Sequence, residues 1–200
     1  MNVLNNIWLA LSTPNETLIS IFSIPFIFLI EMPLSFYLIC NLLNIQYTKK
    51  VKYIYIISTA IIAVFANYCM SWPYNILFNY ATTFIVLFFV MKLGFTKSTI
   101  ATLFPSIVFN LVGILLANPY LDLLNITYEQ NNSIFIYRVP FNLLTYLIVF
   151  ILILILKYRK VTLNILEDFD KKTKSIITIN FVFGFITIFL QGILSSKYID

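Results

Sequence analysis

The stretch NPYLDLLNITYEQNNS, residues 118–133, separates two long apolar runs of the chain. It is the only long break between apolar runs that contains no Lys or Arg, and its charged residues are Asp122 and Glu129. Loops on the inner side of a membrane are enriched in Lys and Arg, and loops on the other side are not. The segment therefore predicts an outward-facing polar loop in a polytopic membrane protein.

The composition supports this class of protein. Of the 200 residues, 60% are hydrophobic and 10% are charged, whereas soluble domains carry about 25% charged residues. A soluble core of this size could not bury so much apolar surface, so the bilayer must be the solvent for most of the chain. We expect an all-α bundle forming a single transmembrane domain over residues 1–200. The abundance of Ile, Asn, Lys, Phe and Tyr is typical of an AT-rich bacterial genome, and we expect the chain in the plasma membrane.

Six apolar segments are predicted to cross the membrane as helices. The second contains Thr59, Ala63 and Ala66 at helical spacing, a stripe of small side chains that favours close helix packing. The predicted helices cover residues 17–45, 53–70, 75–91, 98–117, 134–158 and 176–194.

The basic residues predict the orientation of these helices. The loops after the first, third and fifth segments hold three, two and six Lys or Arg residues, which is 11 of the 13 in the chain. The other side holds only Arg138 and Lys197. Basic loops stay in the cytoplasm, so both termini are expected outside the cell. The net charge of +5 then reflects membrane orientation, and no nucleic-acid partner is expected.

Two ionisable residues are the sharpest candidates for a site. Glu31 lies near the middle of the first predicted helix, where an ionisable side chain is costly and is a functional hypothesis by default. It could contact a ligand, carry a proton or pair with Arg138, or it could join two helices through a hydrogen bond. Arg138 begins the fifth helix on the outer side. Its guanidinium could bind a ligand carboxylate bidentately or extend to lipid headgroups.

The outer turns supply further candidates. Asp122 and Glu129 could meet a cationic ligand, or could be solvated loop acids. Trp72 and Tyr74 could stack on a ligand, or could belong to the aromatic belt at the membrane surface.

Polar side chains also mark one face of the fourth and sixth helices. Asn110 on the fourth helix, and Asn180 and Gln191 on the sixth, could line a cavity or form hydrogen bonds between helices.

Catalysis and metal binding are not expected. The chain has no His, which removes the commonest general base and the commonest metal ligand. Cys40 and Cys69 lie within apolar runs and read as small packing residues. No Gly-rich phosphate loop or paired carboxylates near a nucleophile is present, so no cofactor is predicted.

The chain resembles the membrane sensor domains of peptide-pheromone receptor histidine kinases of the accessory gene regulator C type. The shared features are Glu31 in the first helix, the turn Trp-Pro-Tyr at 72–74, the Lys-x-Gly-x-x-Lys-Ser loop at 92–98 and the long basic loop before the last helix. The resemblance implies a multi-pass receptor in the plasma membrane of a low-GC Gram-positive bacterium. Such a receptor binds an extracellular peptide and acts as a homodimer in two-component quorum sensing. The kinase domain would lie outside this chain, so the chain is expected to be either a truncated sensor or a stand-alone relative.

Two other functions remain open. One is a small-molecule transport or substrate-binding membrane subunit, although such six-helix subunits have inward termini and more Gly. The other is a stand-alone accessory or immunity membrane protein, which nothing in the sequence excludes.

Overall fold

The computed structural model describes residues 3–71, 74–162 and 169–197. Helices make up nearly all of this described part. Extended pairing within it is limited to one bridge between Pro14 and Ile134. The predicted all-α class is therefore confirmed for the described chain.

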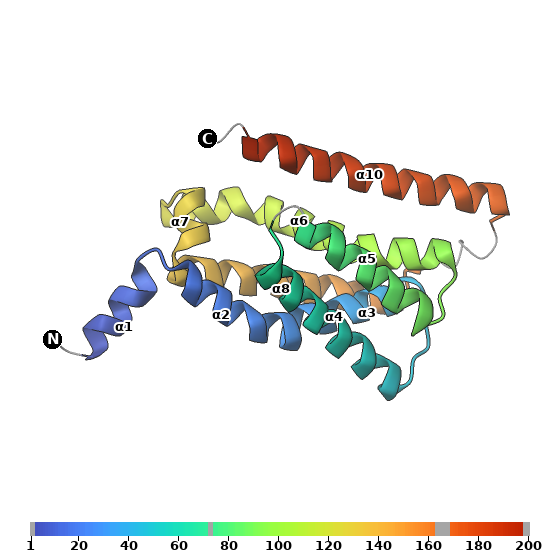
Figure 1. The fold of residues 1–200 in the computed structure, drawn as a ribbon, viewed down its shortest axis with the longest axis horizontal. Coiled ribbons are helices and arrows are strands. Elements are labelled where there is room, and N and C mark those ends of the chain that lie inside the picture. Colours follow the sequence, from blue (N-terminus) through green and yellow to red (C-terminus); the bar gives the residue numbers. More distant parts are fainter. Residues whose placement is uncertain (1–2, 72–73, 163–168, 198–200) are drawn as a thin grey trace.

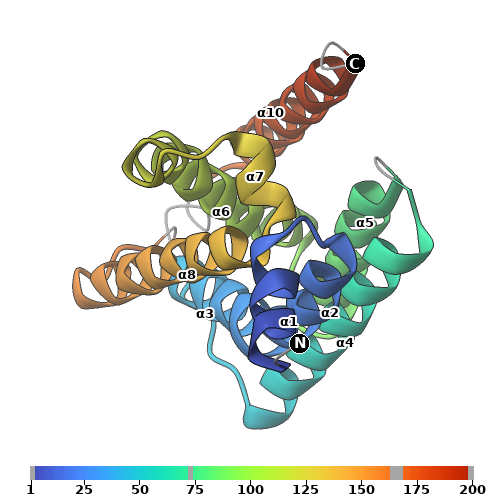
Figure 2. The ribbon, with the colours of Figure 1, turned by 90° about the vertical axis from the view of Figure 1, so that its left-hand side faces the viewer.

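The helices lie side by side along one long axis and alternate in direction (Figure 1). Helix α10 runs along α6 at the edge of the bundle, as the end-on view in Figure 2 shows. In chain order the elements are α1 (Val3–Ser12), α2 (Glu16–Phe26), a π-helical turn (Ile27–Glu31), α3 (Met32–Leu42), α4 (Lys49–Cys69), α5 (Tyr74–Phe89), α6 (Phe95–Leu124), α7 (Tyr128–Ser133), α8 (Phe135–Tyr158) and α10 (Lys171–Lys197).

Four helices of the described chain are long and apolar enough to cross a membrane, and they mark the chain as a membrane protein. They are Thr17–Leu42, Lys49–Cys69, Phe95–Leu124 and Phe135–Tyr158. Helix α5 is apolar but has only 16 residues, whereas a helix perpendicular to the bilayer needs about 20.

The loop predicted over residues 118–133 is wrong for most of its length. Helix α6 continues through Pro119 to Leu124, and α7 occupies Tyr128–Ser133. Leu121 and its leucine neighbours extend the helix. A capping box then starts α7, in which the Thr127 hydroxyl accepts from the Gln130 N–H and the Gln130 side chain accepts from the Thr127 N–H.

The predicted first helix, 17–45, is interrupted near its centre. The Asn15 side chain caps its start by accepting from the Leu18 N–H. Pro25 and Pro33 lack the N–H that a regular helix needs. Between them the hydrogen bonds shift to a π pattern, in which the Met32 N–H donates to the Ile27 carbonyl. This turn ends at Glu31, so the irregular backbone coincides with the ionisable side chain.

The core lies where α3, α4, α5 and α6 meet. Phe36 and Leu87 are fully buried there, and Tyr55 is nearly so. Thr59, Ala63 and Ala66 are all buried, as the stripe of small side chains predicted, and α4 packs against both α3 and α5. Short side chains on α4 let its neighbours approach closely.

We predict that enlarging Ala60, a buried small residue beside this stripe on α4, destabilises the bundle. Ala60 is 0% exposed, while the next residue, Ile61, is 55% exposed. Ala60→Phe should cost about 1–3 kcal/mol because overpacking displaces a neighbouring helix, and Ile61→Phe should cost little. Unfolding of the purified protein in detergent measures both variants, and equal losses would contradict this packing.

Candidate functional site

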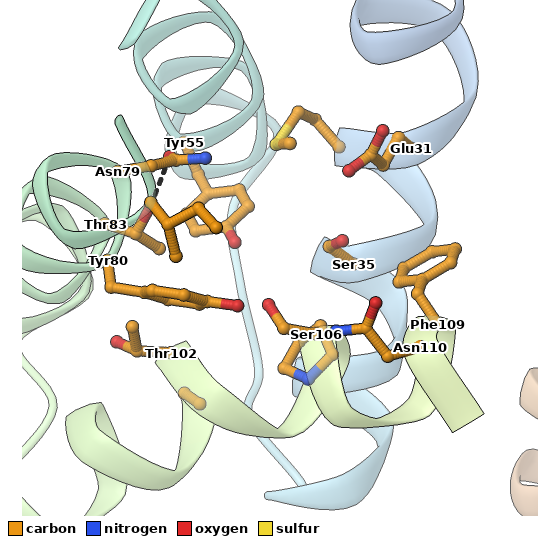
Figure 3. Close-up of a pocket in the computed structure, with 14 residues that line it drawn as sticks. Glu31, Ser35, Tyr55, Asn79, Tyr80, Thr83, Thr102, Ser106, Phe109 and Asn110 are labelled. Carbon is orange, nitrogen blue, oxygen red and sulfur yellow. Dashed lines mark hydrogen bonds between the residues drawn. The ribbon is translucent and has the colours of Figure 1, made fainter. Parts of the chain in front are cut away.

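A polar cavity of about 290 Å³ lies inside the bundle. The first membrane helix, α4, α5 and α6 form its walls, and Figure 3 shows their side chains converging on it. Its lining residues with polar groups are Glu31, Ser35, Tyr55, Asn79, Tyr80, Thr83, Thr102, Ser106 and Asn110. So many polar groups within apolar helices are costly unless they meet one another or a ligand.

The spacing of the lining residues on each helix explains why they converge. Thr102, Ser106 and Asn110 follow one another at four-residue steps and share one face of α6. On α5, Asn79 and Thr83 have the same spacing, and the Thr83 hydroxyl lies 3.5 Å from the Asn79 Oδ1. These two faces point toward each other across the cavity (Figure 3).

Glu31 closes one side of the cavity. Its Oε2 accepts a hydrogen bond of 3.3 Å from the hydroxyl of Tyr146 on α8. The Tyr146 ring meets the Phe109 ring edge to face, with centroids 5.9 Å apart. Glu31 therefore joins the first helix to α8 through a hydrogen bond, one of the roles considered from the sequence, and it also borders the cavity.

An ion pair between Glu31 and Arg138, one of the alternatives considered from the sequence, does not form. The Arg138 guanidinium donates instead to the Asn132 side chain at the end of α7. The helical form of residues 128–133 brings Asn132 to Arg138, and a sequence interpretation that treated this stretch as a loop could not foresee this partner.

Arg138 lines a second cavity of about 240 Å³ between α6, α7 and α8. Tyr128 and Asn142 contribute polar groups to it, and Gly113 keeps its α6 wall open. Phe109 and Asn110 line both cavities. The two spaces therefore adjoin at these residues, with Arg138 bordering one and Glu31 the other. We call them the Arg138 cavity and the Glu31 cavity.

The pair of cavities offers both hydrogen-bond donors and hydrogen-bond acceptors. A guanidinium carries five N–H donors, and the hydrogen bond from Arg138 to Asn132 uses one of them. Across the Glu31 cavity, Tyr80 is hydrogen-bonded to Ser106, and the two hydroxyls face each other in Figure 3. Such an arrangement can bind a ligand with both a carboxylate and hydrogen-bond donors.

The four remaining sequence candidates whose side chains the structure describes do not join these cavities. Asp122 and Glu129 are exposed, and Tyr74 is 67% exposed at the start of α5. Asn180 is exposed on α10. Trp72 and the side chain of Gln191 lie outside the described residues.

Several lining residues were not predicted as a site. Asn79 and Thr83 carry a usable signal, since two polar residues four apart in an apolar helix share one face. Tyr146 carries no such signal, because its partner Glu31 is 115 residues away in the sequence.

Comparison of the chain with protein-family models, curated proteins and solved structures finds no match. Among the described residues, no group of three or more His, Cys, Asp or Glu side chains is placed to hold a metal ion.

We predict that Glu31 and Tyr146 are energetically coupled. In a double-mutant cycle of Glu31→Leu and Tyr146→Phe, the coupling energy should be about 0.5–2 kcal/mol, because either change alone removes the hydrogen bond. Unfolding in detergent provides the four free energies. A cycle of Glu129→Leu with Tyr146→Phe is the control and should be additive within about 0.5 kcal/mol. Additivity in both cycles would contradict a stabilising Glu31–Tyr146 bond.

Proposed function

We propose that this chain is the membrane-embedded ligand-binding module of a bacterial receptor for an extracellular peptide. The observation that carries the proposal is the pair of adjoining cavities, with Arg138 at one and Glu31 at the other. The module binds ligand and has no catalytic role of its own.

The proposed orientation has six membrane crossings and both termini outside the cell. The alternating helices bring the basic segments that follow α3, α5 and α8 to one end of the bundle, and α1, α7 and the end of α10 to the other (Figure 1). The basic end is the cytoplasmic end under the positive-inside rule. The Arg138 cavity then lies nearer the extracellular side, between the halves of α6 and α8 at that end.

The size of the cavities supports a peptide that enters only in part. Ligand pockets for drug-sized molecules start at about 300 Å³, and the Glu31 cavity measures about 290 Å³. It has room for one or two side chains of a larger ligand. A peptide carboxylate binds Arg138, and a donor-bearing side chain passes Asn110 to reach Glu31.

Ligand binding can be transmitted through the contact between Glu31 and Tyr146. A donor from the ligand competes with the Tyr146 hydroxyl for the Glu31 carboxylate, so occupancy biases the packing of the first helix against α8. This mechanism agrees with the resemblance to accessory gene regulator C type sensors, in which helix rearrangement reports an extracellular peptide to a kinase outside this chain.

A transport or substrate-binding subunit is the second candidate. An ionisable Glu31 beside a polar cavity in mid-bundle is also typical of transporters, whose sites lie near the bilayer centre. In that case the same ligand crosses the membrane after binding.

The test uses the exposed thiol of Cys69 at the end of α4, since Cys40 is buried. A membrane-impermeant fluorescent maleimide applied to intact cells should label Cys69, because this end faces outward. The labelled protein, purified into nanodiscs, is titrated with a panel of short linear and cyclic peptides. We expect saturable fluorescence changes with a subset of peptides. Arg138→Gln should weaken binding about tenfold to a hundredfold, because a charge-assisted hydrogen bond is lost.

Arg159→Gln is the matched control, because Arg159 caps the opposite end of α8. This variant should bind the peptide with the affinity of the unmodified protein. A panel without any saturable response, or equal weakening by both Arg variants, would argue against the receptor. Accumulation of a bound peptide inside sealed vesicles would favour the transport subunit.

A further inference from the structure

An apolar groove runs along the outside of the bundle between the first membrane helix and α8. Its volume is about 400 Å³. Ile153 and Leu34 form its buried floor, and Leu29, Phe150 and Leu154 form its exposed walls. These walls lie on the outer surface of the bundle, where lipid chains surround the protein in a membrane.

The groove opens at the basic end of the bundle into a polar pocket of about 420 Å³. The two spaces share Asn41, Tyr47 and Lys157, so they form one continuous site. Lys160 borders the pocket beyond Lys157. The apolar part and the basic part therefore follow each other along the membrane normal.

The length of the groove matches one half of a bilayer. On the first helix its lining extends from Leu29 to Asn41, and 12 residues of helix rise about 18 Å. The hydrocarbon core is about 30 Å thick, so one leaflet accounts for about 15 Å of it. When an acyl chain lies in the groove, its headgroup end is thus at the depth of the lysines.

The charges at the pocket favour an anionic headgroup. Lys157 and Lys160 are exposed, and within the described chain no Asp or Glu lines either space. A third cation lies close by, since the Lys52 ammonium donates to the hydroxyl of Tyr37, which lines the groove.

The backbone carbonyl groups at the pocket do not compete with a ligand for these lysines. The ends of α3 and α8 would otherwise expose free carbonyl groups. Left-handed residues close both ends: Ile45 N–H donates to the Cys40 carbonyl at 2.9 Å, and Val161 N–H donates to the Leu156 carbonyl at 3.0 Å. Basic pockets of this kind between membrane helices are typical binding sites for anionic lipid headgroups.

We propose that the groove and the pocket together bind one anionic phospholipid of the adjacent leaflet. One acyl chain lies against Ile153 and Leu154, and the headgroup phosphate lies between Lys157 and Lys160. This site is separate from the two cavities of the proposed receptor and does not depend on their ligand.

The experiment is native mass spectrometry of the full chain in detergent, with phosphatidylglycerol or phosphatidylcholine added at equal concentration. We expect the unmodified protein to retain one phosphatidylglycerol in preference to phosphatidylcholine. Lys157→Gln combined with Lys160→Gln should lower phosphatidylglycerol affinity about 25-fold, since each lysine near a membrane surface contributes about fivefold. Lys171→Gln combined with Lys172→Gln is the matched control, because both residues are exposed at the start of α10, and it should change affinity less than about twofold.

A second pair of variants tests the groove. Leu154 is 49% exposed and lines the groove, whereas Ile155 is 52% exposed and does not. Leu154→Trp should weaken binding of phosphatidylglycerol and Ile155→Trp should leave it unchanged. Equal binding of the two lipids, or equal losses in the two lysine pairs, would overturn the proposal. Displacement of the lipid by glycerol 3-phosphate at equal concentration would show a site for free phosphoesters and would also overturn it.

Discussion

The hydrocarbon core of a bilayer offers no hydrogen-bond partner, and this constraint governs where each polar group of the bundle lies. Most hydroxyl groups on the membrane helices find a hydrogen-bond partner within their own helix. The hydroxyls of Thr59, Thr82 and Thr145 each donate to the carbonyl four residues earlier in the same helix. Glu31 has no such local solution, because a carboxylate needs donors from elsewhere. It obtains one from Tyr146 on α8 and otherwise borders the polar cavity.

The same constraint acts at the helix ends, where the chain has few glycines to close them. Asn44, Asn125 and Lys160 adopt the left-handed conformation there, which Asn tolerates better than most residues. At the basic end, two such closures leave the nearby lysines free to act on membrane phosphates. At the opposite end, the closure at Asn125 precedes the capping box of α7, which carries the partner of Arg138. Local backbone chemistry thus organises the surroundings of both proposed binding sites.

The all-α class and the membrane location follow from composition and apolar segment length alone. The helix bounds near residues 118–133 were missed because polar composition was given more weight than local signals. The capping box from Thr127 to Gln130 is readable in the sequence and places a helix there. For the site, sequence analysis identified Glu31, Arg138 and Asn110 as separate candidates. That Asn110 lies between the cavities of the other two depends on how α6 packs against α8, which no local pattern encodes.

The central claim is that the Glu31 cavity is a polar space that a ligand can reach from outside the cell. Thiol accessibility tests this most directly, in protein with Cys40 and Cys69 replaced by serine. Thr83→Cys places a thiol in the cavity, and Ile85→Cys places one on a face that is 50% exposed outside it. In intact cells, a small charged thiosulfonate should modify Thr83→Cys and should not modify Ile85→Cys, because a charged reagent enters water-filled space and not lipid. Modification of neither thiol, or of both at equal rates, would contradict the account.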